Sequence, residues 1–191
     1  LSVVEGDVDV ARQFSALPFD HLLFTGSTSV GRQVMRAAAD NLTPVTLELG
    51  GKSPAIIGPG LASSGAFARA VERIIIGKCL NAGQTCIAPD YVLLPAGQEE
   101  AFITAAREVL ASCYPDITRT ADYSTIVDQR QYARLSGYLD EARAAGAKVV
   151  ELMPGVAADP ARRHLPPLAL LETGAELRIM QEEIFGPLLP V

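Results

Sequence analysis

The sequence predicts an α/β fold with mostly parallel strands. Short apolar runs rich in Leu, Ile and Val alternate along the chain with helical patterns, in which apolar residues recur three and four positions apart. Of the 191 residues, 49% are hydrophobic and 20% are charged, which is typical of a globular protein with a packed core. Such alternation indicates parallel strands joined by helices that cover the sheet.

The predicted elements of the first 50 residues alternate in type. In order they are a helix over 8–17, a buried strand over 21–25, a helix over 31–40 and a strand over 45–49. Asp7 is a candidate N-cap of the first helix. Gly50 and Gly51 follow the second strand and mark the sharpest candidate domain boundary. We expect residues 1–50 and 51–191 to belong to different domains.

The remaining residues continue the alternation. In order the pattern predicts a strand over 55–57, a Gly/Pro/Ser loop over 58–65, a helix over 67–80, a strand over 91–94, helices over 99–113 and 128–145, and strands over 148–152 and 168–171. The last of these helices should bury Tyr132, Leu135 and Leu139 and should end at Gly146.

The bulk properties exclude several classes of protein. A formal net charge of −6 and a pI near 4.9 argue against nucleic-acid binding, because nothing would offset phosphate repulsion. No window approaches the roughly 20 apolar residues of a membrane span, and no signal peptide is visible. Three cysteines and two histidines without a CxxC pair predict no metal site. We expect a soluble cytoplasmic protein. The chain begins at Leu1 without a methionine and stops at Val191 inside an apolar run, which indicates a piece of a longer polypeptide.

Residues 24–31, Phe-Thr-Gly-Ser-Thr-Ser-Val-Gly, lie where a strand should pass into a helix. Gly26 would let a phosphate approach the backbone, and the N–H groups of the helix N-terminus would bind it. Ser27 and Thr28 add hydroxyl donors. Alternatively, Gly26 only makes a tight turn, since two glycines at this spacing are weak evidence.

Glu48 lies at the end of an apolar strand, within Leu-Glu-Leu-Gly-Gly-Lys-Ser-Pro. A carboxylate there is costly to bury unless it is neutralised, paired or functional. It could act as a general base, or it could form an ion pair with Lys52 at the strand end. The residue types alone leave both interpretations open.

Cys86 follows a predicted helix, in the loop Asn-Ala-Gly-Gln-Thr-Cys-Ile. A free thiol is weakly ionised near neutral pH, so a nucleophile here needs a base or a positive environment. Most single cysteines are packing residues, and we accept that interpretation for Cys79 and Cys113 on apolar helix faces. A histidine base would have to be His21 or His164, and neither has a suggestive setting.

A fourth polar segment, Gln-Glu-Glu-Ile-Phe-Gly-Pro, spans residues 181–187. Its acids, Glu182 and Glu183, could bind a ribose diol, and Phe185 could flank a ring. The alternative is a solvated turn with Phe185 in the core.

Taken in this order, the four segments resemble the aldehyde dehydrogenase superfamily over essentially the whole chain. The matching pieces are FTGSTSVG at 24–31, LELGGKSP at 47–54, GQTCIAP at 83–89 and EEIFGP at 182–187. A further resemblance, to the class 3-like branch and within it to the coniferyl aldehyde dehydrogenases, lies in QTCIAPDYVLL at 84–94, DYSTIVDQRQYARL at 122–135, EEIFGPLLPV at 182–191 and Tyr114-Pro115-Asp116. The resemblance implies part of a Rossmann-like NAD(P)-binding domain over 1–50, followed by a truncated α/β catalytic domain over 51–191.

The resemblance also implies roles for individual residues. Cys86 would be the catalytic nucleophile and Glu48 the general base. The cofactor, NAD or NADP, would have its pyrophosphate at Gly26 and Ser27 beside Gly31, its adenine at Val30, its nicotinamide at Thr25 and Leu49, and its nicotinamide ribose at Glu183 next to Phe185.

The reaction implied is oxidation of an aldehyde, aromatic or of medium to long chain, to a carboxylic acid through a thiohemiacetal and a thioester on Cys86. Three alternatives are a cysteine-dependent esterase without redox chemistry, a CoA-acylating aldehyde dehydrogenase and a non-catalytic relative. Glu48 favours hydrolysis over transfer to CoA, because water needs a base more than a thiol does. We expect a homodimer or homo-oligomer for the longer protein, and little activity for the piece alone.

Overall fold

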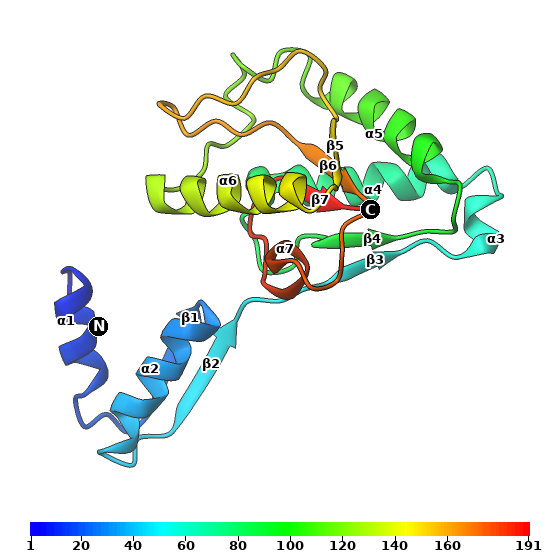
Figure 1. Cartoon of the computed structure of the whole chain (residues 1–191). Helices are drawn as coiled ribbons and strands as arrows, with labels where there is room; N and C mark the ends of the chain where they lie inside the picture. The colour runs from blue at the N-terminus through cyan, green and yellow to red at the C-terminus, as the bar shows by residue number, and fades with distance from the viewer. The chain divides into compact units, whose positions relative to one another are not determined.

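The computed structural model describes residues 1–191, which form two compact units, Leu1–Gly50 and Gly51–Val191 (Figure 1). Each unit combines helices with strands, and this confirms the predicted α/β class. The assignment of the first unit to a cofactor-binding domain and of the second to a catalytic domain stays a prediction.

The first unit is a parallel two-stranded sheet with two helices. In chain order it contains α1 (Val8–Ser15), β1 (Leu22–Gly26), α2 (Thr28–Ala39) and β2 (Val45–Leu49). The strands pair from Leu22 opposite Val45 to Gly26 opposite Leu49. Asp7 caps α1 as predicted, because its carboxylate accepts hydrogen bonds from two backbone N–H groups of the first turn.

Two predictions for this unit are wrong in detail. The apolar run that forms β1 is only half covered, since Leu22 is buried whereas Leu23 is 66% exposed. Successive strand residues point to opposite faces, and the burial alternates accordingly. Helix α2 begins at Thr28 instead of residue 31, because the Ser27 hydroxyl accepts a hydrogen bond from the Val30 N–H at 3.4 Å and caps the helix there.

The second unit contains two sheets and a larger set of helices. In chain order its elements are β3 (Pro54–Ile56), α3 (Pro59–Ala62), α4 (Phe67–Cys79), the 3-10 helix η1 (Leu80–Gly83), β4 (Tyr91–Leu93), α5 (Glu99–Cys113), α6 (Gln129–Ala144), β5 (Lys148–Glu151), β6 (Leu168–Leu171), α7 (Arg178–Gln181) and β7 (Leu188–Pro190). Strand β3 pairs with β4 in parallel, and β6 pairs with β7 in parallel. Strand β5 joins β6 antiparallel.

The strands pair mostly in parallel, as predicted, and β5, which runs antiparallel to β6, is the exception. The structure corrects the predicted pattern of this unit at two points. A short helix, α3, lies within the predicted loop over 58–65, where Pro59 suits the first helical turn. The apolar run at the C-terminal end, not predicted as a strand, forms β7 with all three residues buried.

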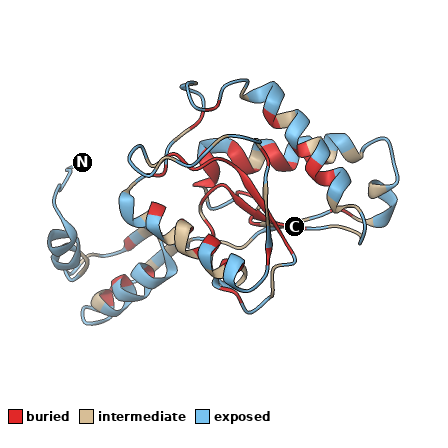
Figure 2. Cartoon of the chain, turned by 45° about the horizontal axis from the view of Figure 1, so that its top comes forward, coloured by how far each residue is buried: buried red, intermediate tan, exposed pale blue.

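The core of the second unit lies among its strands and the inner faces of α4, α5 and α6, where the buried residues gather in Figure 2. Tyr132, Leu135 and Leu139 of α6 are buried, as predicted. Cys79 is buried, as predicted, whereas Cys113 is exposed and that prediction is wrong. No helix in either unit has the length and apolar character needed to cross a membrane.

Lys78 is a charged exception on the buried face of α4. Lys78 is 2% exposed, and its Nζ has no hydrogen-bond partner. Burial lowers the pKa of this amine from 10.5 to about 8, with Lys52 adding to the decrease and Asp90 opposing it. The folded chain therefore carries a buried, unpartnered charge at neutral pH.

We predict that Lys78→Met stabilises the protein by roughly 3 kcal/mol at pH 7. The amine loses its proton near pH 8 in the folded chain but only near 10.5 in the unfolded chain. The free-energy cost of burying the charged amine is therefore fully present below pH 8 and disappears as the pH rises to 10.5. The gain in stability from Lys78→Met should shrink over the same pH range. Urea unfolding at pH 7 and pH 10 measures this. Lys148→Met, at an exposed lysine, is the control, and an equal gain for Lys78→Met at both pH values would contradict the prediction.

Candidate functional site

The carboxyl ends of β1 and β2 bring four predicted site residues to one edge of the first unit's sheet. Thr25 lies opposite Glu48, and Gly26 lies opposite Leu49 in the parallel register. Thr25 and Glu48 are exposed, whereas Gly26 and Leu49 are partly buried. In open α/β sheets, ligands bind at this edge of the strands.

The start of α2 lies at the same edge. Ser27 caps the helix, and its hydroxyl lies 3.0 Å from that of Ser29. A Cβ at Gly31 would come within 2.7 Å of the Leu49 side chain, so glycine permits the close packing of α2 on β2. Val30 is 43% exposed. An exposed helix N-terminus beside a glycine turn suits the pyrophosphate of a dinucleotide.

Glu48 is exposed, so the cost of burying its carboxylate does not apply here. Lys52, which the ion-pair interpretation of Glu48 requires as a partner, binds other groups within the second unit. The Lys52 ammonium forms an ion pair with Asp90 and donates a hydrogen bond to the Ile179 carbonyl at 2.7 Å. The ion-pair interpretation of Glu48 loses its support, and the role of general base stays a prediction.

Cys86 is exposed, in an irregular loop that follows α4 and η1. We call residues 80–90, which include η1, the thiol loop. Its backbone is left-handed at three successive residues, with φ of 51° at Asn81, 52° at Ala82 and 75° at Gly83. For a non-glycine residue this conformation costs about 1–2 kcal/mol, so surrounding contacts must impose it.

Gln84, which the sequence did not single out, supplies several of these contacts. Its side chain is buried, and its Nε2 donates to the carbonyl oxygens of Asn81 at 3.0 Å and Thr125 at 3.1 Å. Its Oε1 accepts a hydrogen bond from the Val127 N–H at 2.8 Å. The amide therefore joins the thiol loop to the segment that precedes α6.

Residues 182–187, which we call the Glu183 segment, lie against the thiol loop. A Cβ at Gly83 would collide with the carbonyl oxygen of Gly186, so the two backbones meet where only glycine fits. A Cβ at Gly51 would lie 3.3 Å from the carbonyl oxygen of Cys86. The Gly51 N–H also donates to Glu183 Oε1 at 3.2 Å. Three predicted motif segments therefore converge within the second unit.

Asp90 links the same three segments and was also missed. Asp90 is 4% exposed, and one of its carboxylate oxygens forms an ion pair with Lys52. The other oxygen accepts a hydrogen bond from the Ile184 N–H at 3.0 Å, while the Asp90 N–H donates to the Ser53 carbonyl at 2.8 Å. A carboxylate directly before an apolar strand was the available signal, because such a group is rarely buried without partners.

The structure places the predicted site residues in two groups. The second unit contains Cys86, which is exposed, and Glu183 and Phe185, both of which are partly buried. The remaining predicted residues lie at the sheet edge of the first unit, described above. The meeting of Glu48 with Cys86 stays a prediction. No group of three or more His, Cys, Asp or Glu side chains is placed to hold a metal ion.

Comparison with known proteins identifies the class. Residues 1–191 match the model of the aldehyde dehydrogenase family throughout, and the chain belongs to this family. It is 55% identical over 191 residues to the "Probable coniferyl aldehyde dehydrogenase" of Pseudomonas aeruginosa. It is 45% identical over 193 residues to the coniferyl aldehyde dehydrogenase of Pseudomonas sp. HR199. The predicted resemblance is confirmed.

The alignments cover 100% of this chain but only 38% and 39% of these two relatives, so the chain spans well under half of their length. A substrate-bound structure of Staphylococcus aureus AldH superimposes with a TM-score of 0.85 at 40% identity, over 98% of this chain and 39% of that one. The structure of an aldehyde dehydrogenase of Mycobacterium tuberculosis in complex with NAD+ superimposes with a TM-score of 0.79 at 29% identity. The superposition covers 97% of this chain and 38% of that one. These solved structures share the fold of this chain.

Proposed function

We propose that the protein of which this chain is a part oxidises an aldehyde to the carboxylic acid with NAD or NADP. The observation that carries the proposal is the exposed Cys86 thiol in a loop packed against the Glu183 segment, in a chain that belongs to the aldehyde dehydrogenase family throughout. The relatives named coniferyl aldehyde dehydrogenases favour an aromatic aldehyde such as coniferyl aldehyde. A cytoplasmic homodimer or homo-oligomer is part of the same proposal.

The residues present fit the cofactor. Gly26 and Ser27 lie at the exposed N-terminus of α2, where backbone N–H groups suit a pyrophosphate. The Glu183 carboxylate is oriented by the Gly51 N–H and can accept hydrogen bonds from a ribose diol. We assign Val30 to the adenine and Thr25, Leu49 and Phe185 to the nicotinamide end.

In the proposed mechanism the Cys86 thiol loses its proton to solvent, and its sulfur attacks the aldehyde carbon and forms a thiohemiacetal. The Cys86 backbone N–H would donate to the developing oxyanion, and one such donor is typically worth ~10²–10³ in rate. Gly26, Ser27 and Glu183 would hold NAD(P)+, which would supply the acceptor for the hydride of the thiohemiacetal carbon, and Cys86 would then carry a thioester. Glu48 then takes a proton from water as the water oxygen attacks the thioester carbon. The carbon–sulfur bond breaks, the proton on Glu48 returns to the leaving sulfur, and the acid and the free thiol are released.

The test is NAD(P)H formation by the full-length protein with aromatic and short aliphatic aldehydes, using NAD and NADP in turn. We expect kcat/KM for coniferyl aldehyde to exceed that for a short aliphatic aldehyde by roughly tenfold or more, since each added apolar contact in a pocket discriminates by such factors. A reaction without aldehyde is the control. Absence of NAD(P)H formation with every aldehyde and both cofactors would refute the proposal.

A cysteine hydrolase without redox chemistry has less support. It needs a histidine base beside the thiol. The His164 ring is buried, stacks edge-on against Tyr123 and leaves its Nε2 without a partner, while the His21 Nε2 is hydrogen-bonded to Thr46. A CoA-acylating enzyme would require CoA for product release, so free acid formed without CoA separates it from the proposed hydrolysis.

A further inference from the structure

Arg134, in the middle of α6, binds the backbone of the Glu183 segment. Its Nη1 donates to the carbonyl oxygen of Glu183 at 3.1 Å, and its Nη2 donates to that of Ile184 at 2.6 Å. The guanidinium is itself fixed, because Nε donates to Gln131 Oε1 at 2.7 Å and Nη1 also donates to the Tyr138 hydroxyl at 3.0 Å. A planar guanidinium holds two successive carbonyls in a defined geometry, which the single ammonium of a lysine does not.

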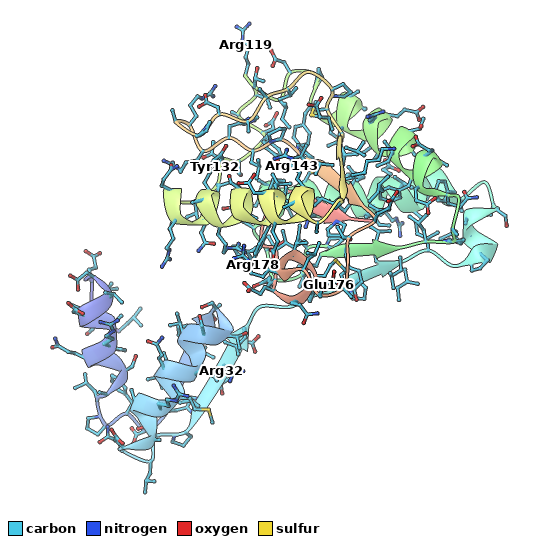
Figure 3. The ribbon with its side chains drawn as sticks, viewed as in Figure 1. Arg32, Arg119, Tyr132, Arg143, Glu176 and Arg178 are labelled. Atoms are coloured by element: carbon cyan, nitrogen blue, oxygen red, sulfur yellow. The ribbon has the colours of Figure 1, made fainter.

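Tyr138 extends this contact from the same helix. Its hydroxyl donates to Glu182 Oε2 at 2.7 Å, and burial together with this hydrogen bond raises the pKa of Tyr138, so the phenol stays protonated and keeps donating. The guanidinium carbon of Arg178, labelled on α7 in Figure 3, lies 5.6 Å from the centre of the Tyr138 ring. Helix α6 therefore binds both the backbone of the Glu183 segment and the side chain of the segment's first residue, Glu182.

The segment has a conformation that needs such support. Phe185 is left-handed, with φ of 49°, and a non-glycine residue pays about 1–2 kcal/mol for this. Strained backbone persists only where surrounding contacts over-determine it. On one side the Ile184 N–H is held by Asp90, and on the other the Ile184 carbonyl is held by Arg134. A Cβ at Gly186 would collide with the Leu135 side chain, so Gly186 packs closely against α6.

We propose that Arg134 is a positioning residue for the cofactor. By fixing the carbonyl oxygens of Glu183 and Ile184, it presents the Glu183 carboxylate in the orientation that binds a ribose diol. A carboxylate held this way loses less conformational entropy on binding, so the arginine raises cofactor affinity without touching the cofactor. This inference rests on the proposed function, which assigns Glu183 to the nicotinamide ribose.

The experiment uses the full-length protein and isothermal titration with NAD+ and NADP+. Arg134→Met should raise the Kd of the cofactor roughly tenfold, the loss expected when a binding side chain must be ordered as the cofactor binds. The KM for the cofactor should rise by a similar factor, while kcat at saturating cofactor changes by less than about threefold. Arg134→Lys, which keeps the charge, should recover part of the affinity. Arg143→Met is the matched control on the same helix, because Arg143 is exposed and pairs only with Asp140 at 3.6 Å.

A double-mutant cycle with Glu183→Gln separates positioning from general support of the fold. If Arg134 acts through Glu183, adding Arg134→Met to Glu183→Gln should raise Kd by less than about twofold further. An unchanged Kd in Arg134→Met, or equal effects of that substitution in both backgrounds, would overturn the inference. Arg134→Lys carries the test if the methionine variant does not fold. A wild-type protein that binds cofactor yet oxidises no aldehyde would refute the proposed function instead.

Discussion

Cys86→Ala in the full-length protein is expected to reduce aldehyde oxidation by roughly 10⁴-fold or more, as removal of a covalent nucleophile typically does. Without the sulfur no thiohemiacetal forms, so hydride transfer has no bound precursor. The residue is exposed, so alanine leaves no cavity in the core and the fold should persist. NAD(P)H formation with coniferyl aldehyde measures the effect, and cofactor binding by titration should remain at the wild-type level.

Cys113→Ala is the matched control for this variant. Cys113 is the other exposed cysteine, at the end of α5, and its loss should leave turnover unchanged. Turnover of the Cys86→Ala protein within about tenfold of wild type would contradict the assignment of Cys86 as the nucleophile.

Glu48→Gln should slow hydrolysis of the thioester by about 10²–10⁴-fold, because general base catalysis contributes factors of this size. Glutamine keeps the shape of the side chain but cannot take a proton from water. The acyl group therefore accumulates on Cys86 after hydride transfer. Rapid mixing should show a burst of about one NAD(P)H per site, followed by slow steady turnover.

Glu72→Gln, at an exposed carboxylate on α4, controls for the change of charge. Steady turnover at the wild-type rate would show that Glu48 is structural. Loss of both the burst and the steady rate would place Glu48 before hydride transfer and contradict its role in hydrolysis.

The accurate predictions concern element bounds and a helix cap, which depend on residues close together in the sequence. The sequence placed β2 at Val45–Leu49, α5 at Glu99–Cys113 and β6 at Leu168–Leu171, and it identified the Asp7 cap. Hydrophobic periodicity and capping act over a few positions along the chain, so they can be recognised without knowing the fold.

The predictions that are wrong concern what lies across space from a residue. An apolar run does not reveal whether both of its faces will be covered, and Leu23 of β1 is 66% exposed. Cys113 was expected on a packed helix face and is exposed at the end of α5. The prediction of mostly parallel strands is accurate, and the sequence did not reveal its one exception, β5, because strand direction follows from how the connecting chain returns to the sheet.

The sequence by itself determined the family of this protein, the glycines that its turns require and the segment in which an exposed thiol lies. Only the tertiary structure decided how that segment is held. Asp90 meets Ile184, and Arg134 meets Glu183, across long stretches of chain. The carboxylate of Asp90 and, in part, the guanidinium of Arg134 are removed from water and need hydrogen-bond partners, and such partners can come from any part of the sequence that the fold brings close.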